Sequence, residues 1–208
     1  YSVTLRLVRR RVLERVVELV DAEGLDQRFR DRVTGGFLYG DFQFSTDASS
    51  DRFLRRGVFS CYRPLGEARP IPSGQRVLSR DDWQSLLVLA HIDKAEAFRR
   101  YSEHYLATDG QLYWSDLHQM GDYVDGYHHA LDARLSPGSK ASEMITEVYV
   151  PLERLDNLLG AAAEELRRLG ADVIYGTVRL IKRDDVTRLA WARSDFACVI
   201  FNLHVEHS

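Results

Sequence analysis

Strict alternation of apolar and polar residues marks several parts of the chain as β-strands. The clearest case is "VIYGTVRLIK", where Ile174, Val178 and Leu180 alternate with polar or aromatic side chains. Other segments share this alternation or are rich in the apolar and aromatic residues that strands favour. We predict strands at 1–8, 35–46, 57–65, 142–150, 173–182 and 195–208.

Three other segments carry the spacing of amphipathic helices. Residues 9–22 contain apolar pairs at helical spacing, and Gly24 follows as a stop signal. Pro151 opens a second pattern, with leucines on one stripe as far as Gly170. A third helix is predicted over 80–106, with Ser79 and Asp82 as its N-terminal cap.

The order strand, helix, strand, strand therefore occurs twice. We predict an α+β fold of duplicated ferredoxin-like βαββ units, which form an antiparallel-rich sheet with helices on one face. The first unit spans 1–65 and the second spans 142–208. Between them, 66–141 is a predicted helical insertion, rich in Tyr, Trp and His toward its end.

The face of the sheet opposite the helices has an unusual composition. Tyr175, Thr177 and Arg179 lie on that face of one predicted strand. Neighbouring strands add four more polar residues, Gln43, Glu147, Asn202 and His204. Such a mixture is typical of a site that orients a polar small molecule. The other interpretation is a polar face satisfied by cross-strand pairs, such as Arg179 with Glu147, and partly covered by the insertion.

Charge, cysteine content and apolar runs indicate which partners and which cellular location to expect. The net charge is −3, which gives no reason to expect nucleic acid or an anionic membrane, and the basic run at 6–11 fits a solvated face. Cys61 and Cys198 lack metal or redox spacing, so we expect reduced, buried thiols and a cytoplasmic location. No apolar run is long enough for a bilayer. The start at Tyr1 suggests a domain of a longer polypeptide.

Known catalytic motifs are missing, and no metal site is predicted. His204 and His207 are three residues apart on a strand and point to opposite faces, so they do not readily share an ion. His128 and His129 are adjacent and diverge on any regular element. The chain has no G-x-S-x-G, P-loop or G-x-G-x-x-G sequence.

The segment "YGTVRLIKRDDVTRLAWARSDFACVIFNLHV" resembles the cap region of FAD-linked oxidases of the vanillyl-alcohol oxidase type, which include alditol and sugar-lactone oxidases. In that family a flavin-binding domain is paired with a cap built on an antiparallel sheet. The matching positions are Thr177, Arg179, Asp184, Asp185 and the strand "FNLHV". "YSVTLRLV" resembles the link between the two domains, and "QLYWSDLHQMGDYVDGYHHALD" resembles the cap insertion.

The resemblance implies oxidation of an alcohol, lactone or related polar substrate by hydride transfer to FAD. Arg179 would then stabilise negative charge, and His204 or Tyr175 would assist removal of a proton. The implied substrate-binding residues are Gln43, Glu147, Thr177, Asn202, Tyr113, Trp114 and Tyr127. Alditol-oxidising relatives have Glu at the position of Thr177, which argues against a polyol substrate.

The resemblance also implies that FAD is held mainly by an upstream FAD-binding domain of the same polypeptide, absent from this chain, so that the fragment alone is inactive. The alternative is a non-catalytic duplicated ferredoxin-like module whose open sheet face binds a small effector or a protein partner. An open face of this kind also predicts self-association, for example as a homodimer.

Overall fold

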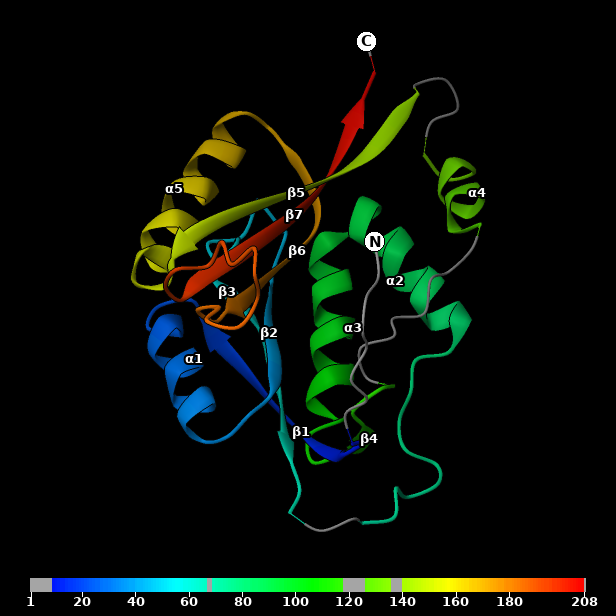
Figure 1. Ribbon diagram of the computed structural model, residues 1–208. Helices are drawn as coiled ribbons and strands as arrows, with labels where there is room; N and C mark the ends of the chain where they lie inside the picture. Colours follow the sequence, from blue (N-terminus) through cyan, green and yellow to red (C-terminus); the bar gives the residue numbers. More distant parts are fainter. Residues whose placement is uncertain (1–8, 67–68, 118–125, 136–139, 208) are drawn as a thin grey trace.

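A computed structural model describes residues 9–66, 69–117, 126–135 and 140–207 of the chain. The fold is α+β, with one antiparallel sheet of seven strands in the order β4-β1-β3-β2-β6-β7-β5. Helices lie on both faces of this sheet (Figure 1).

The strands are β1 (Val12–Asp21), β2 (Tyr39–Phe44), β3 (Arg56–Pro64), β4 (Leu112–Trp114), β5 (Ala141–Pro151), β6 (Asp172–Ile181) and β7 (Phe196–Glu206). The helices are α1 (Leu25–Thr34), α2 (Arg80–Ile92), α3 (Lys94–Leu106), α4 (Tyr127–Asp132) and α5 (Leu155–Arg168), and a 3-10 turn, η1 (Leu152–Arg154), precedes α5.

Helices α1 and α5 cover one face of the sheet, and the main hydrophobic core lies beneath them (Figure 1). Leu155 and Leu159 of α5 are fully buried against this face, as is Phe29 of α1, whose ring meets Phe59 of β3 edge-on at 5.1 Å between centroids. Complete burial of such side chains contributes about 1.5–3 kcal/mol each. This core holds both halves of the sheet to their helices.

Helices α2 and α3 cover the opposite face (Figure 1). A second, smaller core forms there, in which Tyr101 of α3 packs on Val17 of β1 and Val58 of β3. The expectation of a bare second face is therefore wrong, because two helices of the insertion lie over it.

The prediction of a helix over 9–22 is wrong, since Val12–Asp21 form strand β1. Val20 belongs to the core under α1 and α5, whereas Val17 and Leu19 belong to the core under α3. A strand buried on both faces carries apolar residues on both faces, so its sequence loses the simple alternation. The predicted strand 1–8 lies outside the described residues.

Helix α1 begins just after Gly24, where a helix stop was expected. Gly24 adopts a left-handed backbone with φ 70°, and only Leu25 and Phe29 of the helix are buried. A charged helix with so few apolar residues gives a weak periodic signal. The element order strand, helix, strand, strand still holds for β1 to β3, with its first two elements displaced along the chain.

The single helix predicted over 80–106 is divided into α2 and α3 at Asp93. The predicted cap at its start is confirmed, because Ser79 and Asp82 form a reciprocal capping box. Asp93 ends α2 through a backbone bond to the carbonyl of Leu89, and its side chain accepts a hydrogen bond from the backbone N–H of Glu96. One residue thus ends one helix and caps the next.

The remaining predicted strands are confirmed as β2, β3, β5, β6 and β7 with small changes of boundary. The predicted helix after Pro151 is confirmed as η1 and α5, and Gly170 follows α5 with the left-handed φ of 62°. Strand β4 of the insertion was not predicted, and it pairs with the outer edge of β1.

Both cysteines are free and buried, as expected. Within the described ranges, every helix is too short or too polar to traverse a lipid bilayer.

Among the described glycines, Gly176 leaves the least room for a side chain, since a Cβ atom there would stand 2.1 Å from Phe44 Cζ and 2.9 Å from the carbonyl oxygen of Ile200. We predict that Gly176→Ala lowers the free energy of unfolding by about 1–3 kcal/mol, because added volume forces the aromatic ring and backbone apart. Chemical denaturation measures this. Gly66→Ala, where no atom lies within 4 Å, is the matched control and should change stability far less.

Candidate functional site

A cavity of about 1060 Å³ lies between the second face of the sheet and helices α2 and α3. Its floor is formed mainly by β2 and β6, and its roof by the two helices. Its lining also includes Arg32, in the last turn of α1, and Lys182, just after β6. The main side chains of the floor and roof are Tyr39, Asp41, Gln43, Tyr175, Arg179, Trp83, Leu86, Leu87, Phe98, Tyr101 and Tyr105.

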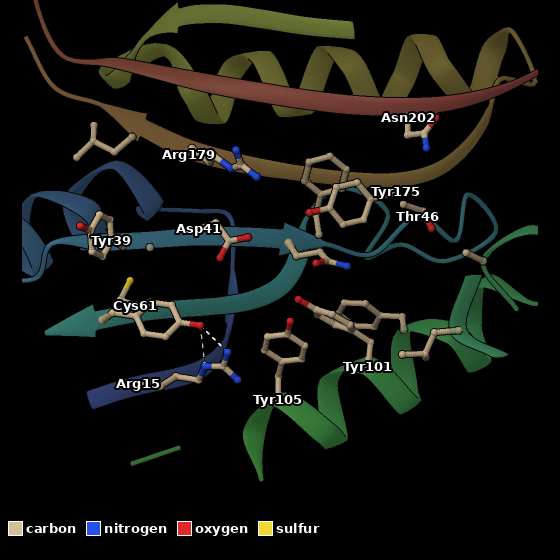
Figure 2. A pocket seen from close by; sticks show the side chains of 18 of the residues that line it. Arg15, Tyr39, Asp41, Thr46, Cys61, Tyr101, Tyr105, Tyr175, Arg179 and Asn202 are labelled. Atoms are coloured by element: carbon tan, nitrogen blue, oxygen red, sulfur yellow. Dashed lines mark hydrogen bonds between the residues drawn. The ribbon is translucent and has the colours of Figure 1, made fainter. Parts of the chain in front are cut away.

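Tyrosines dominate the centre of this cavity. Figure 2 shows Tyr101 and Tyr105 reaching from α3 toward Tyr175 on β6, and the rings of Tyr101 and Tyr105 stack at 4.2 Å between centroids. Burial raises the pKa of all three phenols above the ordinary value, so they stay neutral at physiological pH. They therefore present aromatic faces together with hydroxyl donors.

Arg15 of β1 is held by the aromatic residues at one side of the cavity. Its Nε and Nη2 donate hydrogen bonds to the hydroxyl of Tyr62, drawn as the dashed lines at Arg15 in Figure 2. Its Nη1 donates to Thr108 Oγ1 over 2.8 Å. The guanidinium also lies over the rings of Tyr105 and Tyr113, at 4.9 and 4.5 Å from their centroids. The guanidinium of Arg15 therefore already has partners among the protein's own side chains.

Asp41 and Arg179 face each other across the β2–β6 junction in the centre of the floor. Thr177, with none of its surface exposed, donates a hydrogen bond from Oγ1 to Asp41 Oδ2 over 3.0 Å. Burial raises the pKa of Asp41, although this hydrogen bond and the nearby arginine charges act to lower it. No salt bridge links Arg179 to another side chain within the described ranges, so its guanidinium is available to the cavity.

A second polar cluster lies where α2 meets the N-terminal end of β5 and the C-terminal end of β7. Glu143 Oε1 lies 3.0 Å from His91 Nε2 and 2.8 Å from His204 Nδ1. The two imidazole rings meet edge to face at 5.4 Å between centroids. Burial acts to raise the pKa of Glu143, but the contacts with both histidines outweigh it and leave the pKa lowered. His91 and Glu143 line the cavity, and His204 lies at its rim in a shallow adjoining hollow.

Five residues predicted for the site line this cavity, namely Arg179, Tyr175, Gln43, Asn202 and Tyr127. Thr177 lies beneath it and is engaged by Asp41 and by the carbonyl oxygen of Phe42. The predicted face assignment therefore places most of these side chains on one side of the sheet.

The predicted catalytic residues do not all meet. Arg179 pairs with Cys198 of β7, whereas His204 pairs with Asp172 at the other end of the same ladder. Six residues of β7 separate the two positions, which is ~20 Å at about 3.3 Å per residue. Arg179 and His204 therefore cannot act on the same bond of a small substrate, whereas Tyr175 lies between them.

Three other predicted residues lie outside the cavity. Glu147 is exposed on β5 and accepts a hydrogen bond from the hydroxyl of Tyr149, so it is not the partner of Arg179. Tyr113 packs on Arg15 and accepts a hydrogen bond from Gln111, and Trp114 lies under Arg10. These two aromatic residues support the β1 edge instead of walling the site.

Sequence reasoning missed the residues that do form the roof. Phe98, Tyr101 and Tyr105 recur at intervals of three and four in the predicted helix, and this spacing places them on one face. His91 and Glu143 were missed as well, because nothing in the local sequence of α2 or β5 shows that they meet.

No protein-family model matches the chain, and no curated protein matches it significantly. We therefore infer the function from the geometry of the site.

The raised pKa of Asp41 leads to a prediction about pH. Below the pKa of the unfolded chain the carboxyl is protonated in both states; as the pH rises through the higher folded pKa, the native state must carry a buried charge. We therefore expect the wild-type protein to lose stability relative to Asp41→Asn as the pH rises from the pKa of this carboxyl in the unfolded chain to its higher pKa in the folded protein. Urea unfolding at pH 3 and pH 7 measures the difference.

Asp81→Asn, in the exposed first turn of α2, is the control for loss of a carboxylate as such. If the difference in unfolding free energy between wild type and Asp41→Asn were the same at both pH values, burial would not raise the pKa of Asp41.

Proposed function

We propose that this protein is a ligand-binding module that holds a planar, partly aromatic organic anion between its sheet and helices α2 and α3. The observation that carries this proposal is the cavity of about 1060 Å³, lined by tyrosines around Arg179, which forms no salt bridge among the residues that the structure describes. Binding pockets for small molecules typically measure about 300–1,000 Å³ and combine apolar walls with a few polar groups. The function proposed is binding, without chemistry performed by this chain.

The character of the ligand follows from the groups that face it. Tyr101, Tyr105 and Tyr175 offer ring faces for stacking and neutral hydroxyls for hydrogen bonds. Arg179 offers a planar fork that suits a carboxylate or a phosphate. Asp41 lies opposite Arg179, and with a raised pKa it tolerates an acidic ligand better than an ordinary carboxylate would.

We also propose that the chain is a duplicated ferredoxin-like arrangement. The units β1-α1-β2-β3 and β5-α5-β6-β7 have the same element order once the turn η1 is set aside. If β1, β2 and β3 correspond to β5, β6 and β7, the two units are arranged symmetrically in the sheet. Outward from the β2–β6 junction, the strand order is β2-β3-β1 on one side and β6-β7-β5 on the other. On this proposal, the cavity floor lies where the two units meet.

The cap of an FAD-linked oxidoreductase is the second candidate function. Its support is that Tyr175 and Arg179 of the resembling segment both line the cavity. Against it, α2 and α3 cover the sheet face that a flavin ring would approach. In this candidate function FAD would still come mainly from an upstream domain of the same polypeptide.

Trp83 lines the cavity and provides a direct assay. In a Trp114→Phe, Trp191→Phe background, the only remaining tryptophan reports on this space. We predict that aromatic carboxylates quench or shift its emission in a saturable way, and that the matching neutral amides bind more weakly. The loss of a charge-assisted hydrogen bond predicts about ten-fold weaker binding of the acid to Arg179→Gln, with little change for the amide.

Arg183→Gln, an exposed arginine just beyond the end of β6, is the matched control and should leave both affinities unchanged. Turnover, not flavin binding, separates the two candidates: bleaching of FAD by an alcohol or lactone, in a mixture of this chain with a flavin-binding domain of the same polypeptide, would favour the oxidoreductase cap. Absence of saturable binding by any acid, amide or flavin at millimolar concentration would contradict the ligand-binding proposal.

A further inference from the structure

A cluster of three potential metal ligands lies at one end of the cavity. His91 comes from α2, Glu143 from β5 and His204 from β7, so the three residues are far apart in sequence. Each offers one ligand atom, and these atoms all lie within 4.8 Å of one another. Two imidazoles and a carboxylate form a ligand set that zinc uses where a fourth position stays open.

The hydrogen-bonding pattern around His91 is difficult to satisfy without a cation. Its Nδ1 lies 2.8 Å from the carbonyl oxygen of Leu87, and a carbonyl only accepts, so Nδ1 carries the hydrogen. In a neutral ring Nε2 then has a lone pair, which points at Glu143 Oε1 only 3.0 Å away. A second proton on the ring, a proton on the carboxyl or a metal ion between the two atoms removes this conflict.

The bond from His91 Nδ1 to the carbonyl of Leu87 has a second effect. It fixes the tautomer and the orientation of the ring, as outer hydrogen bonds do for histidines that bind metals. The side chain of His91 is only 2% exposed and that of His204 is 13% exposed, so both rings are held by packing. The ligand atoms are thus positioned before any ion arrives.

Unused oxygen atoms complete the site. Glu143 Oε2 and Asn202 Oδ1 are both buried, and neither has a hydrogen-bond partner within the described residues. Glu143 pairs with His204, and Asn202 lies two residues before His204 on the same face of β7. Buried acceptors without partners cost free energy, which a bound cation or its water would recover.

The distances between the ligand atoms also suit zinc, because the side chains need to move only a little to coordinate it. Tetrahedral zinc with bonds of about 2.0–2.1 Å holds its ligand atoms roughly 3.3 Å apart. The contacts of Glu143 Oε1 with the two histidines, at 3.0 and 2.8 Å, need to open by ~0.3–0.5 Å. The ligand nitrogens of the two histidines lie within 4.8 Å of each other and need to close by ~1.5 Å at most. Because His91 and Glu143 line the cavity, the open coordination position would face the ligand space.

We propose that His91, Glu143 and His204 form a divalent-cation site, with Zn²⁺ as the preferred ion. The site goes beyond the proposed binding of an organic anion and does not require it. Zinc is tested alone, whereas the fluorescence assay is run in chelator, so that either proposal can fail without the other.

The test is a titration of the chelator-treated full chain with zinc sulfate in a calorimeter. We expect one ion per chain, bound with roughly micromolar affinity or better, and a rise in melting temperature of about 5 °C or more at saturating zinc. Glu143→Gln and His204→Gln should each weaken binding about ten-fold or more, since the first replaces a charged carboxylate ligand by a neutral amide oxygen and the second removes an imidazole nitrogen.

Two neighbouring residues provide matched controls. Glu147→Gln lies on the same face of β5 but is exposed, and His207→Gln lies three residues beyond His204, where its ring contacts Ser142. Both should bind zinc like the wild type. Equal loss of binding in His207→Gln, or full retention in Glu143→Gln, would assign the zinc to surface groups and overturn the proposal.

A spectroscopic measurement guards against variants that fail to fold. Cobalt(II) added to the unmutated chain should give the intense visible absorption of a four-coordinate ion and should be displaced by zinc. The weak absorption of a six-coordinate ion, or no uptake at all, would contradict the site whatever the variants do.

Discussion

The pairing of β2 with β6 is the interaction on which the rest of the structure depends. Only three residue pairs make this junction, Asp41 with Arg179, Phe42 with Val178 and Gln43 with Thr177. The pairs alternate in direction, so Phe42 and Val178 enter the main core while the polar pairs face the cavity. The same few residues thus join the two halves of the sheet and supply the floor of the site.

The two faces of the sheet are covered differently, and this difference creates the cavity. Under α1 and α5, large side chains such as Phe42, Phe59 and Leu159 interlock, and Gly176 leaves room for the ring of Phe44. Under α2 and α3, the apolar contact is limited to a small cluster around Tyr101. The remaining space is bounded by tyrosines, whose length holds the helices away from the strands.

Much of the fold could be predicted from the sequence, because β2, β6, β7 and α5 each carry one apolar face and one more polar face. The N-terminal part could not, since β1 is apolar on both faces and α1 is largely charged. The polar face of β6 was predicted because its alternation is strict. The cluster of His91, Glu143 and His204 was not, because it depends on how α2 lies across strands distant in sequence. Local patterns give the direction of a side chain but not the neighbour that it meets.

Asp93 divides the roof of the cavity into two helices that can move separately. It ends α2 and caps α3, so the two helices are separate rods joined at a single residue, with φ −153° and ψ 82°. Rotation about that residue would swing α2 outward while α3 kept its contacts with Val17 and Val58. Such a rotation would open an entry route for a solute of the size of the cavity and would leave every strand pairing intact.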